Sequence, residues 1–406
     1  MVLLFIVLLM IWLFQWKCVF LYRVLYYKAL MTLKQIPFHT IWILLCMLML
    51  TACSSEENPI PFQMDSETLA KRYALVDLHL HLDGSLSMED VRYMASIENV
   101  DLPANDAELE KKLTCPENCE NLNDYLTCFD LPVSVMQSPT TIAYSVSSLV
   151  RRLDAQGLVY AEICYAPQLH LQKGMTQDEV VAASIEGLEQ GLSVCQNGFK
   201  ANLILCCMRG EGNDELNMET VRMAKKYLGQ GVVAVDLAGA EALYPTAKYC
   251  ETFAYARELG VPFTIHAGEA DGVESMELAM DFGARRIGHG IRSWNDAATR
   301  ARVKAEDVCL TFTPTSNLQT KALNISSVAQ YPLHVYLEEG VPVCINTDNM
   351  TVSGTTLHRE FQKLFDVQLL TADEAETIVE TAIRHSFVSE GEKEELLATA
   401  KERMKK

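Results

Sequence analysis

The sequence predicts an α/β protein with the (β/α)8 fold of a TIM barrel and an inserted helical lid after the first strand. Three observations support this fold class. Short apolar runs of strand character alternate with longer stretches of helical periodicity. Eight such runs occur in about 330 residues, which is the number and size expected of a (β/α)8 barrel. No long Gly/Ser-rich or Pro-rich linker, low-complexity run or internal repeat divides the chain after residue 53, so one compact domain is expected.

The expected elements follow one another in regular order. The eight strands are residues 74–81, 158–165, 201–207, 232–237, 261–266, 286–288, 309–313 and 342–346. Helical stretches between them include residues 176–195, 219–228, 246–259, 274–282 and 296–305, with Gly or Pro where turns are needed. The first connection, residues 82–157, is too long for one helix and is expected to carry an insertion over the barrel mouth.

Composition and charge exclude several classes of protein. With 49% hydrophobic and 21% charged residues, the chain is not collagen-like, coiled-coil or intrinsically disordered. It has 34 Lys and Arg residues against 53 Asp and Glu residues, a net charge of −19 at pH 7. Because nucleic-acid phosphates are bound by clustered cations, nucleic acid is not an expected partner. Residues 1–53 differ from the rest, since they contain four basic residues and no acidic one.

The N-terminal residues read as an export signal. Two apolar stretches, residues 1–16 and 41–52, are each shorter than the roughly 20 residues that span a bilayer as a helix. From Met31, a basic region with Lys34, an apolar region and small residues before Cys53 follow in the order of a signal peptide. The segment LTAC (50–53) also resembles the lipobox of bacterial lipoproteins, which implies a lipid on Cys53 and a membrane anchor on the extracytoplasmic side. A plain signal anchor is the alternative.

The chain is accordingly expected to divide into five parts. These are an upstream mis-start or extra membrane segment (1–30), a lipoprotein-type signal peptide (31–52), a lipidated cysteine with its tether (53–69), a barrel (70–395) and a charged tail (396–406). Ten cysteines follow Cys53, a number that suggests disulfides in an exported protein. Their spacing is irregular, so most are expected to be small buried side chains, and a bridge among Cys115, Cys119 and Cys128 is left open.

Two histidines in the first strand are candidate metal ligands. His79 and His81 alternate with leucines in the segment DLHLHLDG (77–84), so they share one face of the strand. Two imidazoles that converge at a strand end suit a divalent transition metal such as zinc. Taken alone, the pair is equally well explained as two hydrogen-bonded histidines without a metal.

Three later strands end in residues of the same chemical kind. His266 ends the fifth strand, and Glu269 just past it is a candidate general acid. His289, between two glycines, can orient or deprotonate a metal-bound water, and Asp348 after the eighth strand is a candidate carboxylate ligand. Each has a structural alternative, such as a core histidine or a surface acid. Together with the first strand they fall at the C-terminal ends of strands, where barrel enzymes keep their active sites.

Six motifs in order resemble the adenosine deaminase family of metal-dependent barrel hydrolases over essentially all of residues 70–390. They are HLHLDGS (79–85), AVDLAGAE (234–241), HAGE (266–269), RIGHG (286–290), PTSN (314–317) and NTDN (346–349). The resemblance implies hydrolysis of adenosine or 2′-deoxyadenosine to inosine or 2′-deoxyinosine and ammonia. It also implies one zinc ion per chain, with water in the remaining position, on ligands His79, His81, His266 and Asp348.

The same resemblance implies roles for further residues. Glu269 would protonate purine N1, and His289 would act on the zinc-bound water, which Asp348 helps to orient. Asp83 and Gly239 match the positions that contact the ribose 5′-hydroxyl and purine N3. Asn349 departs from the commoner pattern of two consecutive aspartates, and a neutral amide there can donate to purine N7. Some bacterial members also carry Asn at this position, so the departure does not by itself indicate an inactive site.

The insertion after the first strand is expected to cover the site. Leu122, Leu126 and Phe129 are spaced at i, i+4 and i+7, on one face of a helix. The resemblance implies that this region is a lid over the nucleoside. Plain core packing is the alternative.

Other functions and residues stay open from the sequence alone. The same metal site could serve a deaminase of adenine or of an N6-substituted purine, and a catalytically inactive nucleoside-binding surface lipoprotein is a third hypothesis. The H-x-E and P-C-x-x-C signature of the other zinc deaminase class is absent. PTSN is left as structural or unassigned, as are four histidines expected to be exposed: His170, His334, His358 and His385.

Overall fold

The computed structural model describes Thr68 and residues 72–404 of the chain. The expected segments 1–30 and 31–52, and Cys53 with most of its tether, lie outside the described residues. The signal peptide and the lipidated cysteine therefore stay predictions. Within the described part of the chain, no helix combines the length and the apolar character needed to cross a bilayer.

Eight parallel strands form the centre of the described domain. They are β1 (Val76–His81), β2 (Tyr160–Tyr165), β3 (Lys200–Met208), β4 (Val232–Ala238), β5 (Thr264–Ala267), β6 (Arg286–His289), β7 (Cys309–Phe312) and β8 (Val343–Ile345). They pair in chain order as two four-stranded sheets, β1 to β4 and β5 to β8. Parallel bridges from Val235 to Phe263 and from Leu80 to Asp348 join the sheets at both seams. The strands thus close into a ring, and the predicted (β/α)8 fold is confirmed, with each strand end within three residues of its predicted position.

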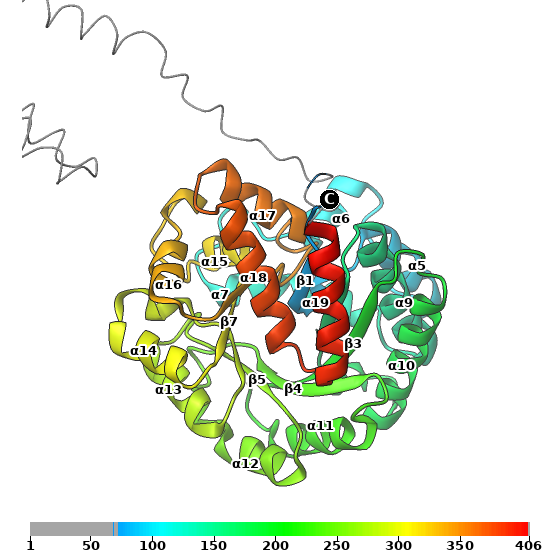
Figure 1. The fold of residues 1–406 in the computed structure, drawn as a ribbon. Helices are drawn as coiled ribbons and strands as arrows, with labels where there is room; N and C mark the ends of the chain where they lie inside the picture. Colours follow the sequence, from blue (N-terminus) through cyan, green and yellow to red (C-terminus); the bar gives the residue numbers. More distant parts are fainter. Residues whose placement is uncertain (1–67, 69–71, 405–406) are drawn as a thin grey trace, which may run out of the picture. The chain divides into compact units, whose positions relative to one another are not determined.

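Helices surround the strands on the outside (Figure 1). In chain order they are α9 (Pro139–Ala155), α10 (Gln177–Ser193), α11 (Asp214–Tyr227), α12 (Cys250–Leu259), α13 (Val273–Phe282), α14 (Ala297–Ala305), α15 (Pro314–Gln319), α16 (Leu333–Glu339), α17 (Leu357–Asp366) and α18 (Ala372–His385). Local sequence sets their ends. Thr176 and Glu179 form a capping box at the start of α10, and Gly260 and Gly283 end α12 and α13 in the left-handed conformation. All five predicted helices are present, although α11 begins five residues before the predicted start.

The connection between β1 and β2 carries the expected insertion. It contains α5 (Met88–Glu98), α6 (Asp106–Leu113), α7 (Leu122–Leu126), the 3-10 turn η3 (Thr127–Phe129) and α8 (Asp130–Ser134) before α9 begins. At the other end of the chain, residues 396–404 do not form a tail. They are the second part of helix α19 (Glu390–Met404), because Leu396 and Ala400 are buried and hold the helix on the domain.

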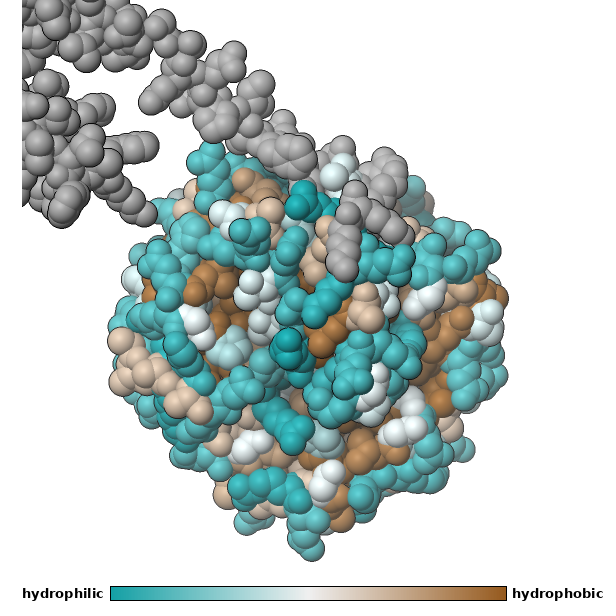
Figure 2. Space-filling view, viewed as in Figure 1, coloured by the Kyte–Doolittle hydropathy of each residue, from teal (hydrophilic) through white to brown (hydrophobic). Residues whose placement is uncertain are grey.

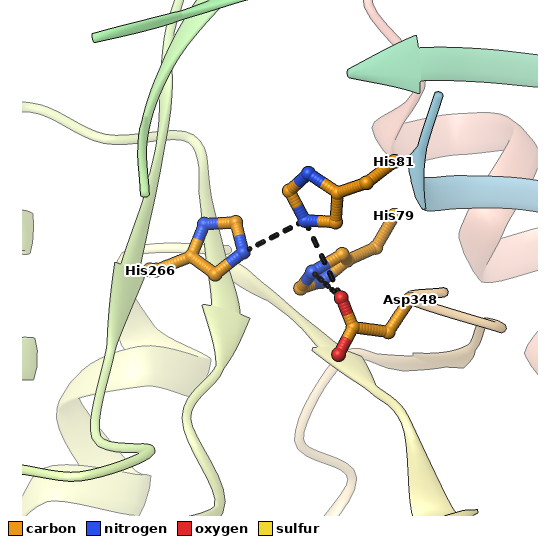
Figure 3. A group of neighbouring side chains, drawn as sticks. All are labelled: His79, His81, His266 and Asp348. Carbon is orange, nitrogen blue, oxygen red and sulfur yellow. Dashed lines mark hydrogen bonds and ion pairs between the residues drawn. The ribbon is translucent and has the colours of Figure 1, made fainter. Parts of the chain in front are cut away.

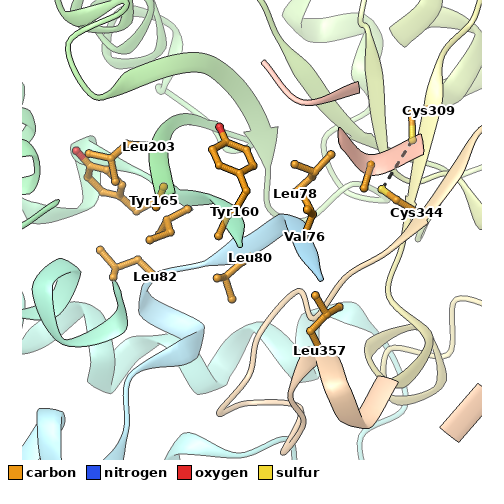
Figure 4. Close-up of a cluster of buried hydrophobic side chains, with 14 of the residues drawn as sticks. Val76, Leu78, Leu80, Leu82, Tyr160, Tyr165, Leu203, Cys309, Cys344 and Leu357 are labelled. Carbon is orange, nitrogen blue, oxygen red and sulfur yellow. Dashed lines mark hydrogen bonds between the residues drawn. The ribbon is translucent and has the colours of Figure 1, made fainter. Parts of the chain in front are cut away.

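The core confirms how β1 is oriented. Val76, Leu78 and Leu80 lie among Tyr160, Leu203 and Leu357 in the apolar layer between strands and helices (Figure 4). Because side chains alternate along a strand, the polar residues of β1 point to the inside of the ring. The face shown in Figure 2 is mostly hydrophilic, with separate apolar areas.

Two of the histidines expected at the surface are buried. His170 is fully buried and its Nδ1 lies 2.9 Å from the Met136 carbonyl oxygen, and His358 is buried on α17. The expectation of exposure was wrong for both, because each lies on the inward face of an element whose direction the sequence does not show.

All ten cysteines of the described residues are free thiols, and seven of them are buried. This agrees with the expectation that most serve as small core side chains.

Candidate metal centre and active site

Four potential metal ligands from three distant segments meet at the C-terminal end of the strands. His79 and His81 come from β1, His266 from β5 and Asp348 from the loop after β8. Their side chains point toward one another (Figure 3), and one ligand atom of each lies within 4.8 Å of the others. Nε2 of His81 is 3.2 Å from Nε2 of His266, and Asp348 Oδ1 is 3.4 and 3.3 Å from Nε2 of His79 and His81.

Neighbouring polar groups fix which atoms face this centre. Nδ1 of His79 lies 2.8 Å from Thr311 Oγ1, and Nδ1 of His266 lies 2.9 Å from Asp236 Oδ2. Each ring therefore keeps its Nε2 for the centre. Nε2 of His79 is buried and has no hydrogen-bond partner. Since a buried polar atom without a partner is costly, this orphaned nitrogen indicates that a further group belongs here.

The two carboxylate oxygens of Asp348 also have different partners. Ser316 donates its hydroxyl proton to Oδ2 at 2.5 Å, which leaves Oδ1 toward the histidines. Burial opposes the charge of Asp348, but the contact with His79 and the other neighbouring imidazoles outweigh it and hold its pKa well below the usual range. An ionised carboxylate and three imidazoles form a donor set that suits a divalent transition metal.

The three imidazoles differ in their protonation. Burial is the main cause that lowers the pKa of His79 and, to about 3, that of His81, so both rings are neutral as metal ligands must be. Burial has the same tendency at His266, but the charge of Asp236 and the hydrogen bond to it raise the pKa of His266 to about 9. Metal binding at Nε2 of His266 therefore has to displace a proton, while the Nδ1 proton stays with Asp236.

Glu269 and His289 form a second pair beside the four ligands. Oε2 of Glu269 lies 3.4 Å from Nε2 of His289, and both side chains are buried. Burial first, and then the nearby charge of Asp348, raise the pKa of Glu269 to about 8. Burial lowers the pKa of His289 well below its usual value. A carboxyl that holds its proton and a neutral imidazole are suited to general acid and base work.

The loop that carries Glu269 is held by another carboxylate. Glu241 accepts hydrogen bonds from the backbone N–H groups of residues 268–271 at 2.7 to 3.0 Å, and from the Ser275 hydroxyl at 2.6 Å.

Gly288 provides space beside one of the histidines. It pairs with His266 across β5 and β6, and a Cβ at Gly288 would lie 3.1 Å from the His266 ring. A side chain at Gly288 would therefore press on the imidazole and shift it by a few tenths of an ångström.

Two residues of the centre have an uncommon backbone conformation. His289 has φ 61° and Asp348 has φ 60°, in the left-handed region that residues other than glycine rarely adopt. Such residues cluster at functional sites, where the surrounding structure holds them in place. For Asp348 that support includes hydrogen bonds across the barrel seam, from its N–H to His79 and from the His81 N–H to its carbonyl oxygen.

A cavity of about 270 Å³ opens above the centre. His81, His266, Asp348, Glu269 and His289 line its polar side. Its wall also contains every residue that the sequence proposed for substrate contacts: Asp83, Gly239, Asn349, Leu122, Leu126 and Phe129. The structure therefore brings all the predicted catalytic, metal-binding and substrate-contact residues to one cavity except His79, whose Nε2 lies 3.4 Å from the cavity-lining Asp348.

The lid residues reach the cavity from two short elements. Leu122 and Leu126 lie in α7, while Phe129 lies in η3, so the predicted stripe is not one continuous helix. Leu122 also packs with Tyr125 and Cys119 in a small apolar cluster separate from the main core. The stripe thus faces both the cavity and this cluster.

Sequence reasoning missed the residues that hold the ligands in place. Thr313 Oγ1 and the side-chain amide of Asn317 lie 3.0 and 2.9 Å from Nδ1 of His289. Asp236, Glu241 and Ser316 act as described above. These residues, except Thr313, belong to the quoted motifs AVDLAGAE and PTSN, which marks them as candidates but does not show which side chain each one contacts.

Comparisons with known proteins agree on one family. The family model described as Adenosine deaminase matches residues 74–403. The chain is similar to an adenosine deaminase of Haemophilus ducreyi, with 46% identity over 82% of this chain and 97% of that protein. An adenosine deaminase of Enterococcus faecalis is 36% identical over 80% of this chain and 96% of that protein. The structure is also similar to that of an adenine deaminase from Arthrobacter aurescens, with a TM-score of 0.74, 27% identity, and coverage of 82% of this chain and 100% of that one.

Proposed function

The chain belongs to the adenosine deaminase family, and from this membership we propose that it hydrolyses adenosine and 2′-deoxyadenosine with one zinc ion per chain. Ammonia and inosine, or 2′-deoxyinosine, are the products. The family membership makes the chain a hydrolytic deaminase. The observation that carries the proposal is the meeting of a four-ligand metal centre and the Glu269–His289 pair at the floor of one cavity.

His79, His81, His266 and Asp348 would hold the zinc ion. The donor set fits zinc, because three Nε2 atoms and one ionised oxygen converge, and Nε2 of His79 has no other partner. Bound there, zinc supplies a Lewis acid that makes water nucleophilic near neutral pH. Thr311, Asp236 and Ser316 keep the ligand atoms aimed at this point.

Glu269 is the proposed proton donor to purine N1. A proton on N1 withdraws electrons from C6 and so favours the attack of water at that carbon. The burial that raises the pKa of Glu269 to about 8 keeps its carboxyl protonated at neutral pH. The hydrogen bonds that Glu241 accepts from the loop fix the position of this acid.

His289 is the proposed base for the attacking water. Nδ1 of His289 lies 3.0 Å from the Thr313 hydroxyl and 2.9 Å from the Asn317 side-chain nitrogen, so Nε2 is the ring atom left for the reacting centre. The proton accepted at Nε2 can then leave with the departing amine as ammonia. The 3.4 Å separation of His289 Nε2 and Glu269 Oε2 supports a joint role for base and acid beside one purine.

The rest of the cavity is proposed to bind the nucleoside. Asp83 would contact the ribose 5′-hydroxyl, Gly239 purine N3 and Asn349 purine N7, and all three line the cavity. Purine N7 is an acceptor, so the contact would come from the side-chain NH2 group of Asn349 as donor. Leu122, Leu126 and Phe129 would exclude water above the purine as a lid.

We also propose that the protein is exported and anchored to a membrane by a lipid on Cys53. The signal-like order of residues 31–52 and the LTAC segment before Ser54 support this. The test is mass spectrometry of the protein after expression in a bacterium, with Cys53→Ser as the control. A lipid-modified N-terminal cysteine in the wild type is expected, and an unmodified mature chain would contradict the proposal.

The deaminase proposal is tested by amine release with the purified chain beginning at Ser54: ammonia from the unsubstituted 6-amino purines and methylamine from N6-methyladenosine. Adenosine, 2′-deoxyadenosine, adenine and N6-methyladenosine are compared, each before chelation, after chelation and after zinc is added back. Conversion of adenosine that chelation abolishes and zinc restores is the expected result. Preference for adenine or the N6-substituted purine would overturn the assigned substrate, and no release from any of the four by zinc-loaded protein would favour a binding role.

A further inference from the structure

Two buried thiols lie on the inside of the barrel beside the metal centre. Cys164 is in β2 and Cys206 is in the adjacent strand β3. Both Sγ atoms lie 3.7 Å from the same atom, Oδ2 of Asp236. A ring nitrogen of His81 and the two Sγ atoms all lie within 4.8 Å of one another. The mechanism proposed above uses neither thiol.

This group can be reached from the cavity. Cys206 and His81 both line the cavity wall, together with Ala166 and Ala238. Apart from His81 and the Asp236 carboxylate, the thiols pack with apolar residues such as Ile204 and Ala234. A small cation that enters the cavity can therefore reach Cys206 and His81 at its wall, and the Cys164 thiol lies next to them.

The ligand chemistry of the group differs from that of the catalytic centre. The catalytic centre offers three nitrogen atoms and one oxygen atom, whereas this group offers two sulfur atoms and one nitrogen atom. Thiolates select soft cations over hard ones. On binding, each thiol gives its proton to solvent, and two metal–sulfur bonds and one metal–nitrogen bond form without any change of oxidation state.

We propose that His81, Cys164 and Cys206 form a second metal site for a soft divalent cation of the cadmium type. Because His81 is shared, a cation bound at this site withdraws one ligand from the catalytic centre. Soft cations are therefore inhibitors that act from beneath the substrate. The inhibition rests on the proposed function, but the binding of the cation does not.

Other thiols in the described residues provide matched controls. Cys207 follows Cys206 in β3 but faces the outer layer, where its Sγ donates to the Asn217 carbonyl oxygen at 3.7 Å. Cys309 and Cys344 are a second buried pair, with Sγ atoms 3.7 Å apart (Figure 4). Among the described residues, neither Cys207 nor this pair belongs to a group of three potential ligands.

The test is a cadmium titration of the full zinc-loaded chain in detergent. Bound cadmium per chain and the ultraviolet absorption of cadmium–thiolate bonds are measured for the wild type and for four variants. Cys164→Ser and Cys206→Ser are expected to lose the thiolate absorption and to bind cadmium at least tenfold more weakly. Cys207→Ser and Cys309→Ser are expected to bind as the wild type does. Alanine replacements and circular dichroism show whether a serine variant has lost binding only because it is misfolded.

The outcomes separate this site from the catalytic one. Cadmium that merely replaces zinc has only nitrogen and oxygen ligands, so inhibition without thiolate absorption would overturn the proposal. Thiolate absorption that persists in Cys164→Ser and Cys206→Ser would overturn it as well. If the absorption depends on both cysteines but the wild type deaminates no purine, the second site stands and the proposed function fails.

Discussion

Glu269 shows how one buried carboxyl acquires its role from its neighbours. Glu269→Gln keeps the size of the side chain but removes a proton that can be transferred. We expect kcat/KM for adenosine to fall by about 10²-fold or more, as is typical when a general acid is lost. Bound zinc per chain is expected to stay unchanged, since Glu269 is not among the four ligands. Glu274→Gln, at an exposed position on α13, is the control. A variant at position 269 with wild-type turnover would show that the proton on N1 has another source.

His170 allows a prediction for stability that is independent of catalysis. Its Nδ1–H donates to the Met136 carbonyl oxygen, while Nε2 is buried and has no partner. Protonation would therefore place a charged, unpaired N–H in the core, and burial lowers the pKa of His170 to about 4. An unfolded histidine has a pKa of about 6.5, so the unfolded state binds the proton first as the pH falls.

The direction of the effect follows from these two values. The stability that neutral His170 contributes is complete above about pH 6.5 and is lost as the pH falls toward 4, by up to about 3 kcal/mol. His170→Asn can keep a donor for Met136 but has no titrating group. Urea unfolding at several pH values is expected to show a shallower loss between pH 6.5 and 4 in the variant. Equal slopes for variant and wild type would contradict the assignment.

Among single residues, those with distinctive chemistry at a strand end could be predicted from the sequence. Two rules bring the four metal-ligand candidates together: every second side chain of a strand lies on the same face, and the C-terminal ends of parallel strands lie at the same edge. These candidates are His79, His81, His266 and Asp348. Asp236 and Ser316 could not be assigned in this way. Their roles depend on which side chain of a neighbouring strand lies beside them, and that register appears only in three dimensions. The burial of His170 was hidden for the same reason.

At the scale of elements, the lid is joined to the loop after β8 by a buried hydrogen bond. The hydroxyls of Tyr125 in α7 and Ser353 are 2.7 Å apart, and Ser353 follows Asp348 by five residues. The Cys115 N–H also donates to the Val352 carbonyl oxygen at 2.8 Å. The lid is thereby held against the segment that carries a proposed metal ligand.

Loss of that hydroxyl contact should loosen the lid. Tyr125→Phe removes about 1 kcal/mol of hydrogen-bond energy, so we expect kcat/KM to fall by about fivefold. Amide hydrogen exchange in residues 115–129 is expected to become faster while exchange in the strands is unchanged. Ser353→Ala should have the same effect, and the double variant should be no worse than either single one. Additive losses would show that the two hydroxyls act independently.

The element scale also shows where sequence patterns cease to be informative. Regular alternation of strands and helices predicted the whole ring, because each βα unit repeats the same local signals. The lid stripe was predicted from a spacing of i, i+4 and i+7, yet α7 ends at Leu126 and a 3-10 turn carries Phe129. Periodicity cannot detect such a change of helix type, since the same three side chains still reach one side.

At the scale of the whole molecule, one ion pair crosses the barrel interior. Nη1 of Arg286 in β6 lies 2.5 Å from Oε2 of Glu162 in β2, and both side chains are fully buried. Arg286 also donates to the carbonyl oxygens of Leu78 in β1 and His385 at the end of α18. Glu162 accepts from the Phe387 N–H at 2.6 Å. The pair therefore ties opposite strands to the segment that follows α18.

Removal of one partner should destabilise the barrel more than removal of both. Arg286→Met leaves the Glu162 carboxylate buried without its countercharge, and the loss of one partner of a buried pair costs about 3–5 kcal/mol. Arg286→Met combined with Glu162→Met removes both charges, so we expect the double variant to regain much of that loss. Arg222→Met breaks the exposed pair with Glu219 and should cost less than about 1 kcal/mol. Urea unfolding measures the stability of all three variants. A double variant less stable than Arg286→Met would contradict the prediction. It would show that the hydrogen bonds to Leu78, His385 and Phe387, rather than charge pairing, hold the barrel together here.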